Sequence, residues 1–346
     1  MIFQKIYKYK SSMQGVIIGL GHGDRVISQA FKLAGFNLLG VFSKNSKKTK
    51  KYSEDNNLKK RYNSIKKICE DKEVNLVAIA VPPKFQKKII QKCIKYKKNI
   101  FCEKPLSNDY KNLKNIFKIL ETYKKSFVVD YFFREHKAFQ KFKKLIPKNI
   151  SKDSIIKIKF KIQSYAYKNR LKNWKLNDNL GGGLINLYLP HIIDYIIFFF
   201  GPIKYIKYKK YQKSKSEINI SLKLQNECTV NIIILANSKK KIHQVYYEDE
   251  KNKFVLKNNQ SDYGKNFKIT KTLKKIDNNN SKKIIDIDYD KSIDLLNYDS
   301  RIFLTSILLK KICNKSINMK TYLKRLEHIE YVLQSIRDFP ITKNYE

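Results

Sequence analysis

Lys104 is the residue of this sequence best placed to do chemistry. It lies in residues 102–107, Cys-Glu-Lys-Pro-Leu-Ser, directly after the apolar run Asn-Ile-Phe. A lysine followed by proline at the end of a buried strand is placed to meet a ligand, because strand carboxyl ends border the binding crevice of open α/β sheets. Partial burial brings an amine's pKa closer to neutrality, so Lys104 could hydrogen-bond a reacting oxygen and help move its proton. Glu103 would orient that amine, or form a salt bridge at the strand end.

A second candidate element is a glycine turn. Residues 15–21 read Gly-Val-Ile-Ile-Gly-Leu-Gly, an apolar strand joined to a turn of the kind that receives a dinucleotide pyrophosphate. The third glycine position of that pattern holds Asp24, and a glycine comes one place early. Alone the match is weak, because any α/β protein can carry turn glycines. With Lys104 it suggests an NAD(P) oxidoreductase, and the candidate cofactor-binding residues of the turn are Gly19, Gly21, His22 and Gly23.

The end of the second expected strand bears on cofactor choice. An acidic residue there would accept hydrogen bonds from the ribose 2′-hydroxyl and repel a 2′-phosphate, whereas this chain has Ser43 and Lys44. We therefore predict that the cofactor is NADP, with NAD possible. Lysine is so common in this chain that its presence at one position could also be chance.

Composition limits the partners. The formal net charge of +43 resembles that of a nucleic-acid-binding protein, but only seven of the 73 basic residues are arginine and the lysines are spread along the whole chain. Nucleic-acid readers favour clustered arginine, whose planar fork matches phosphate and base edges. No specific nucleic-acid partner is expected.

Cysteines and apolar segments indicate the compartment. The five cysteines have no Cys-x-x-Cys spacing, so neither a disulfide framework nor a metal site is expected and a reducing cytoplasm fits. Residues 1–13 lack the apolar core of a secretory signal and are interpreted as an N-terminal extension. The longest apolar stretch, 184–200, is interrupted by polar residues, so no membrane segment is expected.

The chain is long enough for two domains. In residues 14–130 short apolar runs alternate with helical periodicity, which predicts an α/β Rossmann domain with a doubly wound parallel sheet. Its expected strands are 15–19, 37–43, 76–81, 100–103 and 126–131, and its expected helices 25–34, 46–55, 65–71, 85–96 and 109–124.

Residues 131–346 have a different pattern. Longer alternating strands predict a C-terminal α+β domain with an open, mostly antiparallel sheet that buries one face. The expected strands are 155–165, 203–211, 218–225, 228–236 and 242–247, followed by a polar loop at 258–282 with a weak strand at 267–270 and by closing helices at 300–313 and 320–337.

Four blocks, in order, identify a resemblance. They are residues 19–21 (Gly-Leu-Gly), 77–83 (Val-Ala-Ile-Ala-Val-Pro-Pro), 103–106 (Glu-Lys-Pro-Leu), and the triple glycine 181–183 followed by His191 and Asp194. The chain resembles the Gfo/Idh/MocA family, the glucose-fructose oxidoreductase and inositol dehydrogenase group, over nearly its full length. The resemblance implies a nicotinamide cofactor, hydride transfer at a sugar or cyclitol carbon, and a homo-oligomer, dimer or tetramer, formed through the open sheet.

The resemblance also implies roles for individual residues. Lys104 matches the family's catalytic lysine, and His191 would be the second catalytic residue, with Asp194 placed to orient its imidazole. Many relatives carry an aspartate four residues before this histidine, where this chain has Leu187. Val81, Pro82 and Pro83 would border the nicotinamide.

Two further residues have open interpretations. Arg134 falls where relatives carry an arginine just beyond the last Rossmann strand. It could contact the cofactor, or equally form a structural ion pair with Glu135 or Asp130. Trp174 could line the substrate pocket or fill the core. The expected substrate-binding set is Lys104, Trp174, His191 and Asp194.

These observations predict a dehydrogenase that moves a hydride between NAD(P) and a sugar, nucleotide-sugar or cyclitol hydroxyl carbon. An NAD-assisted lyase or glycosidase on the same scaffold is one alternative. A catalytically silent cofactor or sugar binder is another, because of Leu187 and the incomplete glycine pattern.

Overall fold

The computed structural model describes residues 13–262, 264–273, 283–314 and 316–340. Its internal contacts divide the chain into two units, which are described separately. The first comprises the described residues of Met1–Phe132 with Asn179–Gly181 and Arg301–Glu330, and the second comprises the described remainder. The sequence interpretation placed all of 131–346 in one domain, whereas residues 301–330 pack with the first unit.

The first unit is built on a five-stranded sheet in the order β2-β1-β3-β4-β5. Every neighbouring pair is parallel. The central strands are apolar and fully buried, because a parallel sheet is covered on both faces. This confirms the predicted Rossmann-like parallel sheet. The strands are β1 (Gln14–Ile18), β2 (Asn37–Phe42), β3 (Leu76–Ile79), β4 (Asn99–Cys102) and β5 (Phe127–Val129).

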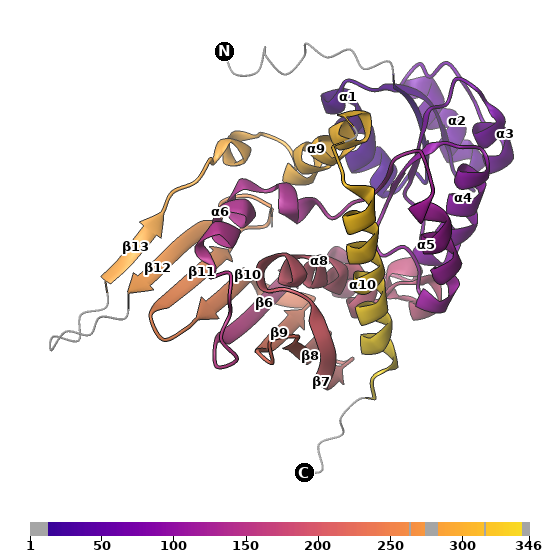
Figure 1. The fold of residues 1–346 in the computed structure, drawn as a ribbon. Helices are drawn as coiled ribbons and strands as arrows, with labels where there is room; N and C mark the ends of the chain where they lie inside the picture. The colour runs from indigo at the N-terminus through magenta and orange to yellow at the C-terminus, as the bar shows by residue number, and fades with distance from the viewer. Residues whose placement is uncertain (1–12, 263, 274–282, 315, 341–346) are drawn as a thin grey trace, which may run out of the picture. The chain divides into compact units, whose positions relative to one another are not determined.

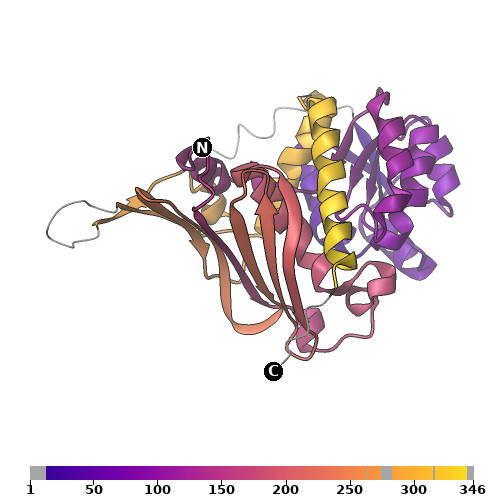
Figure 2. The ribbon, with the colours of Figure 1, turned by 60° about the horizontal axis from the view of Figure 1, so that its bottom comes forward.

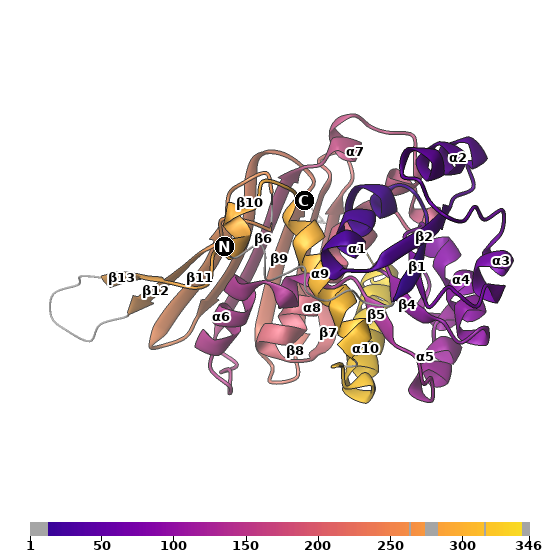
Figure 3. The same ribbon diagram turned by 90° about the horizontal axis from the view of Figure 1, so that it is seen from above.

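The order of the strands decides where the helices lie. The chain moves one way from β1 to β2 and the other way from β2 to β5, and right-handed crossovers then place the helices of the two directions on opposite faces. Figures 1 and 3 show this, with α3, α4 and α5 on one side of the sheet and α1 on the other. The helices are α1 (Ser28–Ala34), α2 (Ser46–Asp55), α3 (Ile65–Glu70), α4 (Pro83–Lys95) and α5 (Lys114–Glu121).

Two C-terminal helices return to the first unit. Helix α9 (Ser300–Asn314) lies beside α1 in Figures 1 and 3, and α10 (Met319–Asp338) follows it. The Tyr322 hydroxyl accepts a 2.7 Å hydrogen bond from the Val129 amide, and the Glu330 carboxylate accepts one of 2.8 Å from the Leu106 amide. Residues 301–330 therefore complete the first unit at its β4–β5 end.

The second unit is built on an eight-stranded sheet in the order β13-β12-β11-β10-β6-β9-β8-β7, whose long strands are seen in Figure 2. All pairs are antiparallel except β6 with β9, which confirms the mostly antiparallel prediction. The strands are β6 (Ile155–Gln163), β7 (Ile203–Gln212), β8 (Glu217–Leu224), β9 (Thr229–Leu235), β10 (Asn237–Glu248), β11 (Asn252–Asn258), β12 (Lys268–Leu273) and β13 (Lys283–Ile287).

The sequence interpretation missed parts of this sheet. It did not include β11 or β13, and its weak strand at 267–270 covers only the first half of β12, within an expected polar loop at 258–282. Residues 274–282 of that expected loop lie outside the described residues.

Helices α6 (Lys137–Leu145) and α8 (Gly183–Phe200) pack against one face of the eight-stranded sheet. Strand β6 alternates accordingly, with Ile156 and Ile158 buried and Lys157 exposed. Among the described helices, α8 alone is long and apolar enough to cross a membrane, but 72% of its apolar window is buried inside the structure, as in a core helix.

Candidate active site

The glycine turn follows β1 and is tightly constrained at Gly19. Its φ is +104°, and a Cβ there would lie 2.3 Å from the Ala80 carbonyl oxygen. Only glycine fits a backbone this close to its neighbour. At Gly21, by contrast, a Cβ would meet nothing within 4 Å. The turn thus presents open backbone at the carboxyl end of β1, which fits the approach of a dinucleotide pyrophosphate.

The incomplete glycine pattern has a structural explanation. Residues Gly23–Ile27 form a π-helical turn that leads into α1, with the Ser28 amide bonded to the Gly23 carbonyl. A π turn holds one more residue than an α turn. Gly23 is buried, and a Cβ on it would lie 2.6 Å from the Ile17 side chain. We infer that Gly23 provides the close helix–strand packing expected one place later, while Asp24 stays partly exposed.

Lys48 was missed by the sequence interpretation. This first-turn residue of α2 donates a hydrogen bond to the Leu20 carbonyl of the glycine turn. Arg25 approaches the same turn, with its Nε 3.3 Å from the Gly21 carbonyl oxygen. Two cations therefore flank the backbone that would face a pyrophosphate. The Arg25 contact is local, but the Lys48 contact does not follow from local spacing, since Lys48 comes 28 residues after Leu20.

The proline turn follows β3, the strand next to β1. Pro82 and Pro83 stand at the start of α4, where a missing N–H costs nothing. The buried Gln86 amide donates to the Val81 carbonyl at 3.1 Å and accepts from the Cys102 thiol at 3.0 Å, so it ties this turn to the end of β4.

Lys104 follows β4, the next strand along. The Glu103 amide donates to the Ile79 carbonyl at 2.9 Å, which extends the β3–β4 pairing to the residue before the lysine. The Lys104 side chain is partly exposed. The glycine turn, the proline turn and Lys104 thus follow the carboxyl ends of three adjacent parallel strands, as the sequence interpretation expected.

A histidine–carboxyl cluster lies at the same edge. His22 Nε2 is 3.0 Å from a Glu103 carboxylate oxygen and 4.0 Å from an Asp130 oxygen. Burial and the neighbouring Glu103 carboxylate raise the pKa of Asp130 well above its usual range. Burial also opposes ionisation of Glu103, but His22 and Lys104 outweigh it and lower the Glu103 pKa to about 2. The two pKa shifts are opposite in direction, so ionisation is easier at Glu103 than at Asp130.

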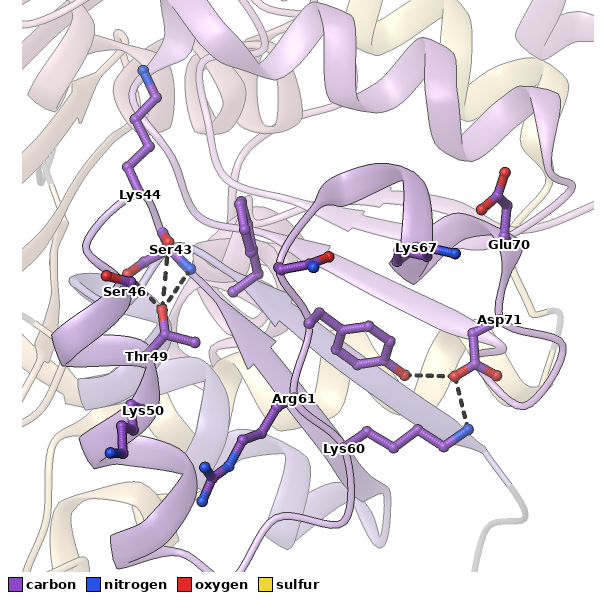
Figure 4. A pocket seen from close by; sticks show the side chains of 13 residues that line it. Ser43, Lys44, Ser46, Thr49, Lys50, Lys60, Arg61, Lys67, Glu70 and Asp71 are labelled. Carbon is purple, nitrogen blue, oxygen red and sulfur yellow. Dashed lines mark hydrogen bonds and ion pairs between the residues drawn. The ribbon is translucent and has the colours of Figure 1, made fainter.

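A pocket of about 980 Å³ lies beyond the end of β2. Figure 4 shows Ser43, Lys44, Thr49 and Lys50 on one side of it and Lys67, Glu70 and Asp71 on the other. The Ser43 hydroxyl is 3.0 Å from the Thr49 hydroxyl and also donates to the Asn45 carbonyl. Lys44 lies over the Phe85 ring at 4.3 Å. The predicted ribose-reading residues thus line a hollow rich in cations.

The second unit holds the other predicted residues. A Cβ on Gly182 would lie 2.2 Å from the Trp174 carbonyl oxygen, which is a clash. Gly183 has a φ of +82°. These glycines bring the Trp174 turn against the start of α8. The Trp174 side chain is only half-buried, so it does not fill the core. Its role in binding substrate stays a prediction.

Asp194 and Arg134 form a buried ion pair. Arg134 Nε donates to both Asp194 carboxylate oxygens at 2.9 Å, and its Nη2 donates to the Asp194 carbonyl at 2.9 Å. The sequence interpretation considered Glu135 and Asp130 as ion-pair partners of Arg134 and did not consider Asp194, which α8 brings from 60 residues away. His191 lies one turn earlier on α8, buried, with its ring 5.2 Å from that of Phe133. A cofactor contact of Arg134 stays a prediction.

Comparisons with known proteins agree with this geometry. Residues 13–131 match the model of the Gfo/Idh/MocA oxidoreductase family, NAD-binding Rossmann fold. An uncharacterised oxidoreductase of Synechocystis is 24% identical over 275 residues, which are 73% of this chain and 74% of that protein. The family match and this relative support an NAD(P)-dependent oxidoreductase.

Two solved structures share the fold of nearly the whole chain. One is described as a putative NADPH-dependent oxidoreductase from Desulfitobacterium hafniense, with a TM-score of 0.76, 18% identity and coverage of 94% of this chain and 96% of that one. The other is levoglucosan dehydrogenase in complex with NADH and L-sorbose, with a TM-score of 0.76, 12% identity and coverage of 94% and 96%. One is described as NADPH-dependent and the other binds NADH, so the fold leaves the choice of cofactor open.

Proposed function

We propose, from the match of residues 13–131 to the Gfo/Idh/MocA oxidoreductase family, that this protein transfers a hydride between NADP and a hydroxyl-bearing carbon of a sugar, nucleotide sugar or cyclitol. The observation that carries the proposal is the shared edge of β1, β3 and β4. There the open glycine turn, the proline turn and Lys104 follow neighbouring strand ends. Ligands of open α/β sheets bind at such an edge.

The proposed chemistry divides between cofactor and protein. The bound nicotinamide supplies the hydride acceptor or donor. In the oxidative direction the substrate carbon loses a hydride, its hydroxyl loses a proton, and a carbonyl forms. Lys104 Nζ, in its neutral amine form, accepts that proton, and His191 is the proposed second catalytic residue. Arg134 holds Asp194, which steadies the helix that carries His191.

We predict that Lys104→Ala lowers kcat by roughly 10²- to 10⁴-fold, because it removes the proton acceptor. Cofactor affinity should change little, since the lysine does not bind the pyrophosphate. The measurement is steady-state kinetics with the best substrate of a sugar panel, alongside cofactor titration. Lys111→Ala, an exposed lysine nearby, is the matched control. Near-wild-type turnover in Lys104→Ala would refute the mechanism.

The preference for NADP is supported by the charge around Ser43. Lys44, Lys50 and Lys67 line the pocket at this end of β2, and cations favour a 2′-phosphate. Ser43→Asp would place a carboxylate there, and we expect it to shift the ratio of the Kd values toward NAD by 10-fold or more. Titration of both cofactors into both proteins measures this. Tighter binding of NAD than of NADP by the wild type would contradict the proposal.

One observation favours a second function. Leu187 is half-buried on α8 where many relatives carry an acid, so the chain could bind a cofactor or a sugar without turning it over. Cofactor binding with no turnover over a broad sugar panel would support that alternative. A tightly copurifying NAD would instead favour the redox-assisted lyase or glycosidase.

The proposal includes the cellular location and the oligomeric state of the enzyme. The five cysteines are free thiols, which fits a cytoplasmic location. A homo-oligomer through the outer face of the eight-stranded sheet is part of the same proposal.

A further inference from the structure

Asp130 occupies an unusual place for a carboxyl group. It follows β5 and is 1% exposed. Its backbone amide donates to the Cys102 carbonyl at 2.9 Å, which fixes it beside the residues that end β4. From α9, the Thr305 hydroxyl lies 3.2 Å from both carboxyl oxygens. The side chain is therefore held between β4 and α9, away from water.

The groups around Asp130 decide which carboxyl of the cluster keeps a proton. One oxygen each of Asp130 and Glu103 and a ring nitrogen of His22 all lie within 4.8 Å of one another. Two ionised carboxylates this close would repel strongly in a buried site. Glu103 has the closer nitrogen partners, His22 Nε2 at 3.0 Å and the adjacent Lys104, whereas Asp130 has the Thr305 hydroxyl at 3.2 Å. The proton therefore belongs on Asp130.

We propose that Asp130 is a positioning residue: as a neutral carboxylic acid it donates a hydrogen bond to Glu103 and so fixes the anion that lies between His22 of the glycine turn and Lys104. The proposal rests on the proposed role of Lys104 as proton acceptor. It connects the cofactor-binding turn to the catalytic lysine through three side chains of the first unit. It also accounts for His22, whose Nε2 faces Glu103.

Two variants distinguish the effect of the Asp130 hydrogen-bond donor from the effect of side-chain size. Asp130→Asn keeps the size and an N–H donor but cannot ionise, and we expect its kcat at pH 7 to stay within about threefold of the wild type. Asp130→Val keeps a similar size without a donor, and we expect kcat to fall about 10- to 100-fold, the value of a hydrogen bond to a charged group. The cofactor Kd should change little in both, because neither variant alters the glycine turn. Wild-type kcat in Asp130→Val would overturn the positioning role.

The pH dependence gives a second, sharper readout. In the wild type, ionisation of Asp130 at high pH would place two carboxylates together, so kcat should fall on the alkaline side. Asp130→Asn should lack that fall. The charged and titratable groups that act on Asp130 are Glu103 and Lys104 after β4 and His22 after β1, while α9 contributes the Thr305 hydroxyl. Identical pH–rate profiles would overturn the proposal.

Thermal unfolding tests the protonation of Asp130 in the folded protein and needs no substrate. The pKa of Asp130 is raised in the folded state, so its contribution to stability is present below the unfolded pKa near 4 and is lost as pH rises toward the folded value. The Tm of Asp130→Asn relative to wild type should therefore rise with pH from 4 upward. A constant difference would show that Asp130 ionises normally and would overturn the proposal.

These readouts separate the two levels of inference. If no substrate is turned over but the Tm difference rises with pH, the proposed function fails and the neutral carboxyl stands. Zn²⁺ is the last probe, because the same three side chains are metal-ligand types. Wild-type Tm should be unaffected by added Zn²⁺ or EDTA. A Zn²⁺-dependent rise that is absent in Asp130→Asn would replace the hydrogen-bonded cluster with a metal site.

Discussion

At the scale of single residues, the site depends on positions that have no side chain. Gly19 combines a positive φ with a backbone approach to Ala80, and its amide donates to the Phe42 carbonyl at 2.8 Å. It thereby joins the ends of β1, β2 and β3 in one turn. Gly21, two residues on, is open and leaves space for a ligand.

We predict that Gly19→Ala destabilises the first unit and abolishes cofactor binding. An alanine there has a strained φ, which costs roughly 1–3 kcal/mol, and its Cβ collides with a backbone carbonyl. Gly21→Ala is the control, since its Cβ meets no protein atom and the fold should be unaffected. Chemical denaturation and cofactor titration of both variants measure this. Equal stability of the two variants would mean that the turn is less constrained than its geometry indicates.

The sequence predicts the place of a residue when the pattern that identifies it lies close to it in the chain. Lys104 and the glycine turn stand at strand ends with local motifs, so their places were predictable. Lys48 and Asp130 acquire their neighbours only when segments far apart in sequence meet, 28 residues for Lys48 and 175 for the Thr305 bond to Asp130. A carboxyl directly after the buried Val128-Val129 run was the one available signal for Asp130.

At the scale of elements, α6 shows how a histidine can start a helix. The Ala138 amide donates to His136 Nδ1 at 3.0 Å, and Nε2 lies 2.8 Å from the Gly264 carbonyl oxygen. The ring therefore needs its Nδ1 unprotonated to cap the helix. The sequence interpretation missed α6, since histidine is not a usual cap and the helix begins just after the last Rossmann strand.

We predict that His136 makes the second unit acid-sensitive. Burial lowers its pKa to about 4, so the neutral ring stabilises the fold above the unfolded pKa near 6.5 and this stability is lost as pH falls through about 4. The loss amounts to about 3 kcal/mol. His136→Asn keeps a capping oxygen but does not titrate. Urea unfolding at pH 7 and pH 4 should show a smaller acid loss in His136→Asn, and an equal loss would contradict the assignment.

Other elements show where hydrophobic periodicity and secondary-structure propensity do not predict the structure. The strands of the Rossmann sheet were predicted to within a few residues because buried parallel strands are short, continuous apolar runs. Strand β11 has two lysines and two asparagines among its seven residues, and β13 is only five residues long. Pairing with neighbouring strands, not composition, makes them strands. The place of α9 and α10 in the first unit was not predictable, because an amphipathic helix does not reveal which sheet it will cover.

At the scale of the whole molecule, net charge should govern association. The outer face of the eight-stranded sheet, the proposed oligomer surface, carries Lys157, Lys159 and Lys161 on β6, and Lys157 and Lys253 flank the Tyr246 ring at 5.9 and 5.2 Å. Like charges brought together by two copies repel, and salt screens them.

We therefore predict that the oligomer fraction increases with ionic strength, from mostly monomer near 0.01 M to dimer or tetramer above about 0.15 M, where the Debye length falls from about 30 to 8 Å. Sedimentation velocity at several salt concentrations measures this. Lys159→Glu should weaken the salt dependence. A monomer at every salt concentration would show that this sheet face does not form the interface.

The return of residues 301–330 to the first unit has a consequence for synthesis. The ribosome completes the five strands by residue 132, but about 200 more residues, through residue 330, must be added before α9 and α10 can join them. At roughly 5–20 residues per second, the growing chain carries an incomplete nucleotide-binding unit for about 10–40 s. During that interval the apolar surface that Tyr322 and its neighbours will cover is open to other nascent chains. Expression yield should therefore depend on chaperones that hold partly made proteins, and a fragment ending near residue 150 should aggregate.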